Sequence, residues 1–159
     1  MAEMNGVLER RLKTSRPVAD PATRMLMNLD LADAHFQEEF EAATITEGLS
    51  MSAYNVLRIL RGNPEGHPRT DIAQRMVYRR TDLTRLIDRL LRRGLAERRR
   101  GRRDRRLSVT RITAKGVKTL ERLDPLIDEL VERYRRKLTG PELGELSRLL
   151  EKLYLEHVD

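Results

Sequence analysis

The feature that most constrains the fold is an amphipathic helical pattern that leads directly into an arginine-rich hairpin pattern. In the segment TDLTRLIDRLLRRG (residues 81–94), leucine and isoleucine recur at steps of three and four, which is the spacing of one buried helix face. Gly94 stands where a left-handed cap would end this helix. The following segment, LAERRRGRRDRRLSVTRIT (95–113), surrounds a glycine-containing tip with arginine and β-favouring residues, which predicts two antiparallel strands joined by a basic loop.

A shorter helix is predicted immediately before this one. Thr70 is a candidate N-cap for the segment DIAQRMVYR, because threonine is a favoured residue at helix N-termini. Two helices joined by a short turn and followed by a β-hairpin form a winged helix-turn-helix. The predicted fold is therefore mainly α with a small β-hairpin wing, in the order four helices, hairpin, two helices. The buried side of the shorter helix is expected to comprise Ile72, Ala73, Met76 and Val77.

Longer helices are predicted on both sides of this unit. Ahead of it, apolar residues recur at helical spacing until Gly48, and Ser50 can cap the helix that follows. Behind it, Thr113 can cap a long helix, in which Pro125 predicts a kink or a split into two. The segment TGPE (139–142) has the residues of a capping box at the start of the last helix. The apolar positions of the first, the long and the last helix are Leu26, Leu29, Phe36, Phe40 and Ala43; Val117, Leu120, Leu123, Ile127, Leu130 and Tyr134; and Leu143, Leu146, Leu149, Leu150 and Leu153.

These patterns divide the chain into an arm and three segments. Residues 1–20 have little periodicity and are expected to form a flexible N-terminal arm. Residues 21–48 are expected to form a dimerisation helix, residues 49–113 the DNA-binding domain, and residues 114–159 the C-terminal dimerisation helices. The outer helices carry more apolar surface than a small winged domain needs, which favours a homodimer that joins through the N- and C-terminal helices. The alternative is that these helices pack only on their own domain.

The charge of the chain is concentrated in its middle third. The formal net charge is +7, and residues 69–106 hold 15 arginines against 5 acids. A charge that serves only solubility would be spread along the chain, whereas a focused one is typical of a surface that binds phosphates. Aromatic residues make up 4% of the chain and tryptophan is absent, which disfavours a stacking platform for single strands. Double-stranded DNA is therefore the expected partner.

The residue inventory argues against an enzyme. The chain has no cysteine, which excludes disulfides, thiolate metal sites and thiol redox sensing. His35, His67 and His157 are scattered and match neither a catalytic nor a metal-ligand spacing. We therefore expect no cofactor and no metal. No stretch approaches 18 apolar residues and the first residues lack an apolar signal core, so we expect a cytoplasmic protein with no membrane partner.

One face of the helix in residues 81–94 is suited to contact bases. Opposite the apolar stripe, at ~100° per residue, lie Thr81, Arg85, Asp88 and Arg92, with Thr84 and Arg89 beside them. For Arg89 and Arg92 taken alone, a solvated helix face is the favoured interpretation. The N-terminal half of such a helix reaches base edges in the major groove, so Thr81 and Arg85 are candidate base contacts. Asp88 is better explained by local charge balance, although an acid in the major groove can also accept from cytosine.

The sequence resembles the MarR family of winged-helix transcription regulators over roughly residues 22–157. The segment DRRLSVTRITAKG (104–116) fits the wing-to-helix signature of that family: Asp, any residue, Arg, a strand, an apolar residue before Thr, and Gly three residues after the Thr. The segment LTRLIDRLLRRGLAER (83–98) resembles the family's recognition helix and its exit. The wing loop is shorter and more basic than many in the family. The signature falls on Asp104, Arg106, Val109, Ile112, Thr113 and Gly116.

The resemblance implies roles for individual residues. Arg106 would enter the minor groove, whose negative potential attracts arginine, and Asp104 would hold its rotamer or shape the turn. Members of the family commonly respond to small aromatic or phenolic ligands, for which His35 and Tyr54 are the candidate pocket residues. The remaining wing arginines would contact phosphate, while residues of the recognition helix would lie in the major groove. These are Arg102, Arg103 and Arg105 in the wing, and Arg80, Thr81, Thr84 and Arg85 in the helix.

The expected function is that of a sequence-specific transcription regulator, a repressor, that reads a pseudo-palindromic operator in double-stranded DNA as a homodimer. A small-molecule ligand would relieve this binding. Two alternatives stay open. A non-specific architectural DNA- or RNA-binding protein would explain the arginine run equally well, whereas a winged-helix adaptor for protein–protein contacts would leave the basic middle segment unexplained. The salt dependence of binding separates phosphate contacts from an apolar adaptor contact.

Overall fold

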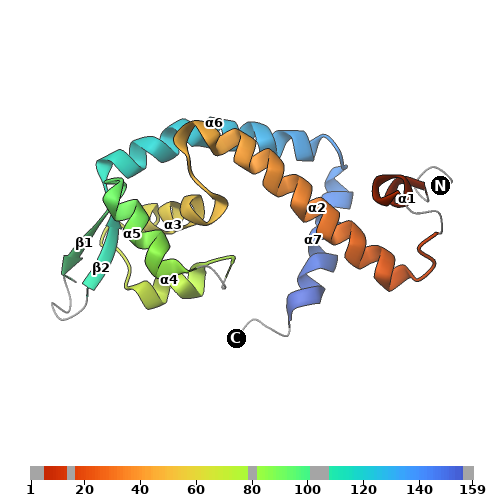
Figure 1. Ribbon diagram of the computed structural model, residues 1–159, viewed down its shortest axis with the longest axis horizontal. Coiled ribbons are helices and arrows are strands. Elements are labelled where there is room, and N and C mark those ends of the chain that lie inside the picture. Colours follow the sequence, from red (N-terminus) through yellow and green to blue (C-terminus); the bar gives the residue numbers. More distant parts are fainter. Residues whose placement is uncertain (1–5, 14–16, 79–81, 101–107, 156–159) are drawn as a thin grey trace. The chain divides into compact units, whose positions relative to one another are not determined.

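The chain folds into two compact units, Met1–Ala42 and Ala43–Asp159, in a computed structural model. Figure 1 traces the helices of both units and the hairpin of the C-terminal unit. No helix in the described part of the chain is both long enough and apolar enough to cross a membrane. The residues that the structure describes are 6–13, 17–78, 82–100 and 108–155.

The N-terminal unit contains the short helix α1 (Val7–Leu12) and most of α2 (Pro21–Thr44). α1 falls within residues 1–20, where the sequence predicts a flexible arm. Glu9 on α1 forms an ion pair with Arg24 on α2. Part of the predicted arm is therefore helical and linked to α2.

The C-terminal unit is a winged helix-turn-helix that continues into two further helices. Together with α2, its elements follow the predicted order of four helices, hairpin and two helices, and α1 is an additional helix. Its elements are the 3₁₀ turn η2 (Ile45–Glu47), α3 (Met51–Arg61), α4 (Arg69–Arg75), α5 (Leu83–Arg92), β1 (Ala96–Arg100), β2 (Ser108–Ile112), α6 (Ala114–Arg135) and α7 (Gly140–Tyr154).

The hairpin is attached to the helices at its base (Figure 1). β1 and β2 pair antiparallel, with Ala96 opposite Ile112. His67, in the loop before α4, forms a bridge to Thr110 of β2, and each backbone N–H donates to the other carbonyl at 2.9 Å. Gly66 allows this approach, because a Cβ there would lie 2.6 Å from the carbonyl oxygen of Thr110. The loop before α4 therefore fixes the position of the wing strands.

α3 is the central helix of the C-terminal unit and contacts α4, α5, α6 and β2. Its N-cap Ser50 accepts a hydrogen bond from the backbone N–H of Ala53 at 3.3 Å, which confirms the predicted cap. Val56, Leu57 and Leu60 on α3 are fully buried. The other fully buried leucines and isoleucine around them are Ile72, Leu86, Leu90, Leu95, Leu120, Leu123 and Leu130.

The start of α4 differs from the prediction. The helix begins at Arg69, and Pro68 (φ −56°, ψ 153°) occupies the N-cap position. Pro68 already has the extended conformation that an N-cap needs, so the helix starts directly after it. Thr70 lies in the first turn of α4, and its prediction as the cap is wrong.

The end of α4 also differs. Ile72 and Met76 are buried as predicted, but Ala73 and Val77 are exposed, and Val77 is 72% exposed. Met76 is extended (ψ 133°) and ends the helix. The helical periodicity on which the predicted burial of Val77 rests therefore stops one residue before it.

α6 and α7 begin at their predicted caps. The hydroxyl of Thr113 accepts from the backbone N–H of Gly116 at 3.1 Å, and Thr139 forms a capping box with Glu142. α6 continues unbroken through Pro125, so the predicted alternative of a split into two helices is wrong. α7 has no buried residue, which leaves its predicted apolar positions accessible.

Candidate nucleic-acid interface

α5 is anchored by its apolar stripe and exposed on its polar face. Leu86, Ile87 and Leu90 are buried. The side chain of Arg85 is 90% exposed, and its Nε lies 3.1 Å from a carboxylate oxygen of Asp82. Asp82 is also the N-cap, since its other oxygen accepts from the backbone N–H of Arg85 at 3.1 Å. The predicted base-contacting face is therefore accessible from the first turn of the helix.

Thr84 is oriented by the preceding helix. Arg69, the first residue of α4, donates from Nη1 to Oγ1 of Thr84 at 2.9 Å. The contact is exposed, so it contributes little to stability, but it leaves the hydroxyl hydrogen of Thr84 available to donate. An acceptor on a DNA base or a phosphate is a suitable partner for that hydrogen.

The rest of the polar face of α5 is basic. Asp88 accepts from Nη2 of Arg98 on β1 at 2.8 Å, which is the local charge balance expected for this acid. Arg89 and Arg92 have neither an ion pair nor a hydrogen bond through their side chains within the described residues. Arg85, Asp88, Arg89, Leu91 and Arg92 together line a hollow of about 710 Å³ on this helix.

The two strands carry the basic loop of the wing. Arg100 at the end of β1 pairs with Ser108 at the start of β2. On β1, Glu97 accepts from Arg99 at 2.9 and 3.0 Å, and this hydrogen bonding lowers the pKa of Glu97. Several predicted contact residues lie outside the described part of the chain. They are Arg80 and Thr81 before α5, and Arg102, Arg103, Asp104, Arg105 and Arg106 in the wing.

A cluster of charged residues, here called the exit clamp, ties the end of α5 to α6. Arg93 donates to the backbone carbonyls of Glu47 and Gly48 at 2.5 and 2.8 Å. The Glu47 carboxylate accepts from Arg122 of α6 at 2.5 and 3.0 Å, and this hydrogen bonding holds the pKa of Glu47 below its usual value. Lys115 donates to the carbonyl of Arg93 at 2.8 Å. Sequence reasoning missed this cluster because its members are widely separated along the chain.

Gly116 has a steric role at the same junction. A Cβ at this position would lie 2.2 Å from the carbonyl oxygen of Leu95 and 2.7 Å from Cγ1 of Ile112. The same carbonyl of Leu95 accepts from the backbone N–H of Thr113 at 3.1 Å. The glycine of the wing-to-helix signature is therefore explained by the close approach of α6 to the start of β1.

The two candidate ligand residues, His35 and Tyr54, belong to different compact units. His35 on α2 is exposed, and its Nε2 lies 3.6 Å from a carboxylate oxygen of Glu39. Tyr54 on α3 is buried, which raises the pKa of its phenol, and the guanidinium of Arg58 lies 5.9 Å from the centre of its ring. Each residue therefore has local partners within its own unit.

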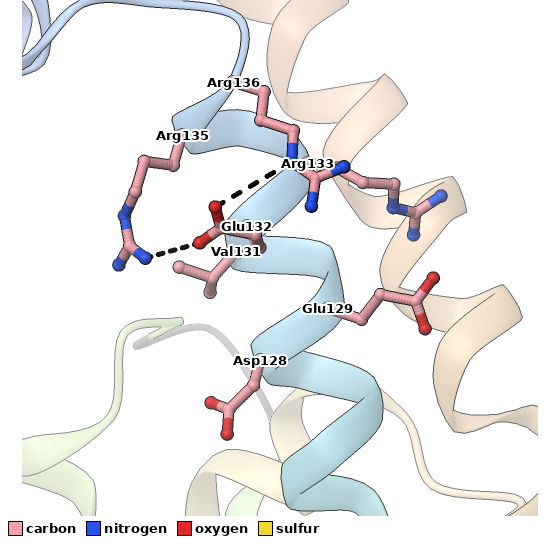
Figure 2. A pocket seen from close by; sticks show the side chains of 7 residues that line it. All are labelled: Asp128, Glu129, Val131, Glu132, Arg133, Arg135 and Arg136. Carbon is pink, nitrogen blue, oxygen red and sulfur yellow. Dashed lines mark hydrogen bonds and ion pairs between the residues drawn. The ribbon is translucent and has the colours of Figure 1, made fainter.

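A hollow of about 560 Å³ lies along the last turns of α6 (Figure 2). Glu132 lies between Arg135 and Arg136, with N–O distances of 2.5 and 3.8 Å. Three acids and three arginines line this hollow, so it has no net preference for either charge. Its lining residues are Asp128, Glu129, Val131, Glu132, Arg133, Arg135 and Arg136.

Comparisons with known proteins agree with this architecture. A family model described as "MarR family" matches residues 47–107. The HTH-type transcriptional regulator BilQ of Clostridium symbiosum is 30% identical over 123 residues, which cover 74% of this chain and 84% of BilQ. The HTH-type transcriptional regulator PrsX of Escherichia coli is 28% identical over 153 residues, or 94% of this chain and 91% of PrsX.

Solved structures of the repressor CouR share the fold. CouR bound to a 23-mer DNA duplex is 26% identical with a TM-score of 0.72, covering 91% of this chain and 100% of that one. CouR from Rhodococcus jostii RHA1 bound to p-coumaroyl-CoA is 20% identical with a TM-score of 0.72, covering 87% of this chain and 95% of that one.

Proposed function

Since the chain belongs to the MarR family of DNA-binding transcription regulators, we propose that it is a cytoplasmic, homodimeric repressor of a pseudo-palindromic operator. The observation that carries the proposal is the exposed face of α5. There Arg89 and Arg92 stand without ion pairs among the described residues, opposite a buried leucine stripe and next to the strands of a basic wing. This arrangement suits insertion into a groove lined by phosphates.

In the proposed complex α5 lies in the major groove. Thr84 and Arg85 stand on its first turn, and Arg80 and Thr81 directly precede its N-cap, so this end of the helix meets the base edges. Arg85 can donate two parallel hydrogen bonds to a guanine, as arginine commonly does. In a homodimer the two copies of α5 would read half-sites one helical turn apart, about 34–36 Å.

The wing is proposed to contact the adjacent minor groove. Arg106 enters the groove, and Asp104 restricts the rotamers of Arg106 so that less side-chain entropy is lost on binding. Arg102, Arg103 and Arg105 contact phosphates and add affinity without sequence information. The support for this assignment is the signature that these residues complete, together with the paired strands that carry the loop.

We propose that residues 21–48 and 114–159 form the dimer interface, and that residues 49–113 bind DNA. The support comes from α7, where Leu146, Leu149 and Leu153 are 46%, 46% and 52% exposed. They are spaced by three and four residues and therefore form one apolar face. A second copy of the chain would cover this face in a two-fold symmetric contact, which a pseudo-palindromic operator requires.

A small aromatic ligand is proposed to relieve repression, with His35 and Tyr54 as the candidate contacts. The support is the complex of CouR with p-coumaroyl-CoA. A ligand that binds the DNA-free form more tightly than the DNA-bound form would weaken DNA binding by the ratio of the two affinities. The proposed activity is regulation by binding, with no enzymatic step.

The proposed function is tested by selecting bound sequences from random duplex DNA at about 150 mM salt, where non-specific attraction is partly screened. The expected result is an enriched inverted repeat. The variant Arg85→Gln should lose the preference at one position of each half-site, whereas Arg148→Gln, on α7, should keep it. Binding without any enriched motif would contradict sequence-specific repression and favour an architectural protein.

A further inference from the structure

The C-terminal unit contains a third pocket, here called the α3–α4 pocket, with a volume of about 410 Å³. It shares no lining residue with the hollow on α5 or the hollow on α6. Two of its residues come from the last turns of α3, and the others come from the loop before α4 and from the last residue of α4. The lining residues are Arg58, Ile59, Gly62, Asn63, His67 and Arg75.

The charge of the residues that line the α3–α4 pocket is positive. Neither Arg58 nor Arg75 forms an ion pair with an acid of the described residues, although both are exposed. Arg61, on the same helix as Arg58, is by contrast paired with Asp124 at 2.7 and 3.2 Å. No lining residue of the pocket is acidic. Asp71 lies beside the pocket, where its carboxylate is 3.9 Å from Nδ1 of His67.

The wall of the α3–α4 pocket is held in place by hydrogen bonds within the protein. The side chain of Asn63 accepts from the backbone N–H of Glu65 at 3.2 Å and donates to the carbonyl of Gly66 at 3.0 Å. His67 is held to β2 by its two backbone hydrogen bonds, and only 10% of its side chain is exposed. A ligand would therefore need to order only the two arginines, which keeps the entropic cost of binding small.

We propose that the α3–α4 pocket binds a small anionic metabolite that carries two phosphate or carboxylate groups, one for each guanidinium. Guanidinium groups match phosphate and carboxylate oxygens with paired hydrogen bonds. The volume falls in the range of small-molecule sites, about 300–1,000 Å³. The pocket adjoins Tyr54, a candidate contact of the aromatic ligand, because the guanidinium of Arg58 lies 5.9 Å from the centre of that ring. The inference does not depend on any operator.

A phosphate of the DNA backbone is the competing source of the same chemistry. The geometry favours the free anion, because the two arginines line a pocket instead of extending from the polar face of α5. If DNA were the ligand, each arginine would act as one more non-specific phosphate contact.

The experiment is calorimetric titration of the full chain with pyrophosphate and, separately, with citrate. Wild type and Arg92→Gln, which removes an unpaired guanidinium from α5, are expected to bind one anion per chain. Arg58→Gln and Arg75→Gln are each expected to bind at least about tenfold more weakly, which corresponds to the loss of a charge-assisted pair. Because Arg75 has no ion pair with a described acid, Arg75→Gln should retain the thermal unfolding midpoint of the wild type. Arg58→Gln also removes the contact of Arg58 with the ring of Tyr54, so it should lower the midpoint slightly, and Arg75→Gln is the variant that decides.

A second titration, with random-sequence duplex DNA over a range of salt, separates the two sources. Arg75→Gln is expected to keep the salt dependence of the wild type, whereas Arg92→Gln should reduce the log–log slope by about 0.9. The proposal is overturned if Arg75→Gln reduces this slope and the anions do not saturate the wild type. It is equally overturned if Arg92→Gln weakens the anions as much as Arg75→Gln does, because the attraction would then be one of general charge.

Discussion

At the scale of single residues, Gly116 has the least room for a side chain among the described glycines. Alanine is favoured over glycine inside a helix by about 1 kcal/mol, but here its Cβ would meet the carbonyl oxygen of Leu95 at 2.2 Å. We expect Gly116→Ala to lower the free energy of unfolding by about 1–3 kcal/mol, because the backbone must move to relieve the overlap. Urea denaturation measures this change.

Gly144 provides the matched control for this substitution. It lies in α7, and a Cβ there would meet no atom within 4 Å. Gly144→Ala should therefore raise the free energy of unfolding by up to about 1 kcal/mol. Equal effects of the two substitutions would show that helix propensity, and not the contact with Leu95, governs the position of Gly116.

Also at this scale, replacement of Arg106 and replacement of Arg85 are expected to change DNA binding in different ways. Arg106→Ala should weaken binding to an operator by tenfold or more, because an arginine in a narrow minor groove interacts with its negative potential. Arg85→Ala should relax the base preference at one position, because it removes a contact to a base edge. Titrations with a set of single-base operator variants separate the two effects. If Arg106→Ala binds like the wild type, the assignment of the wing is wrong.

At the scale of elements, the exit clamp makes the attachment of α5 to α6 dependent on pH. The pKa of Glu47 is lowered from 4.5, chiefly by the hydrogen bonds from Arg122. A lowered pKa means that the stabilisation is complete above the usual value and is lost as pH falls through the lowered one. We expect Glu47→Gln to reduce the free energy of unfolding at pH 7, and the difference from wild type to shrink below about pH 4. Denaturation at both pH values measures it.

The control for the exit clamp is Glu151→Gln on α7, where the Glu151 carboxylate accepts a 3.5 Å hydrogen bond from Ser147. This variant should match the wild type at both pH values. If Glu47→Gln also matches the wild type at pH 7, the pair of Glu47 and Arg122 does not stabilise the junction.

The elements themselves could largely be predicted because their determinants are local. Ser50, Thr113 and Thr139 each cap a helix through an atom three residues away, and such a signal is visible in a short window of sequence. The error at Thr70 has the same origin, since Pro68 is an equally local signal that competes with it. The bridge from His67 to Thr110 and the exit clamp join residues that are 22 to 75 positions apart. Their geometry follows from the packed core and is not encoded in any one window.

At the scale of the whole molecule, the charge distribution predicts how DNA binding responds to salt. Each phosphate neutralised by an arginine contributes about −0.9 to the slope of log affinity against log salt. Replacing both Arg89 and Arg92 by glutamine should therefore reduce the slope by about 1.8, provided that both contact the backbone. Fluorescence anisotropy with a labelled duplex measures the slopes. An unchanged slope would place the DNA on another surface of the chain.

The assembly of two copies is tested on α7, where about half of the surface of each of Leu146, Leu149 and Leu153 is exposed. Leu149→Glu puts a charge on this apolar face. In a monomer the substitution would cost little because the site is already open to water, but in a dimer it would bury an unpaired carboxylate.

We expect analytical ultracentrifugation to find the wild type as a dimer and Leu149→Glu as a monomer at micromolar concentration. Ser147→Glu, about 160° away around the helix, should remain dimeric. A monomer presents only one α5 to the operator, so Leu149→Glu should also lose the preference for an inverted repeat over a single half-site. If the wild type were monomeric and still preferred the inverted repeat, the two-fold arrangement would be contradicted.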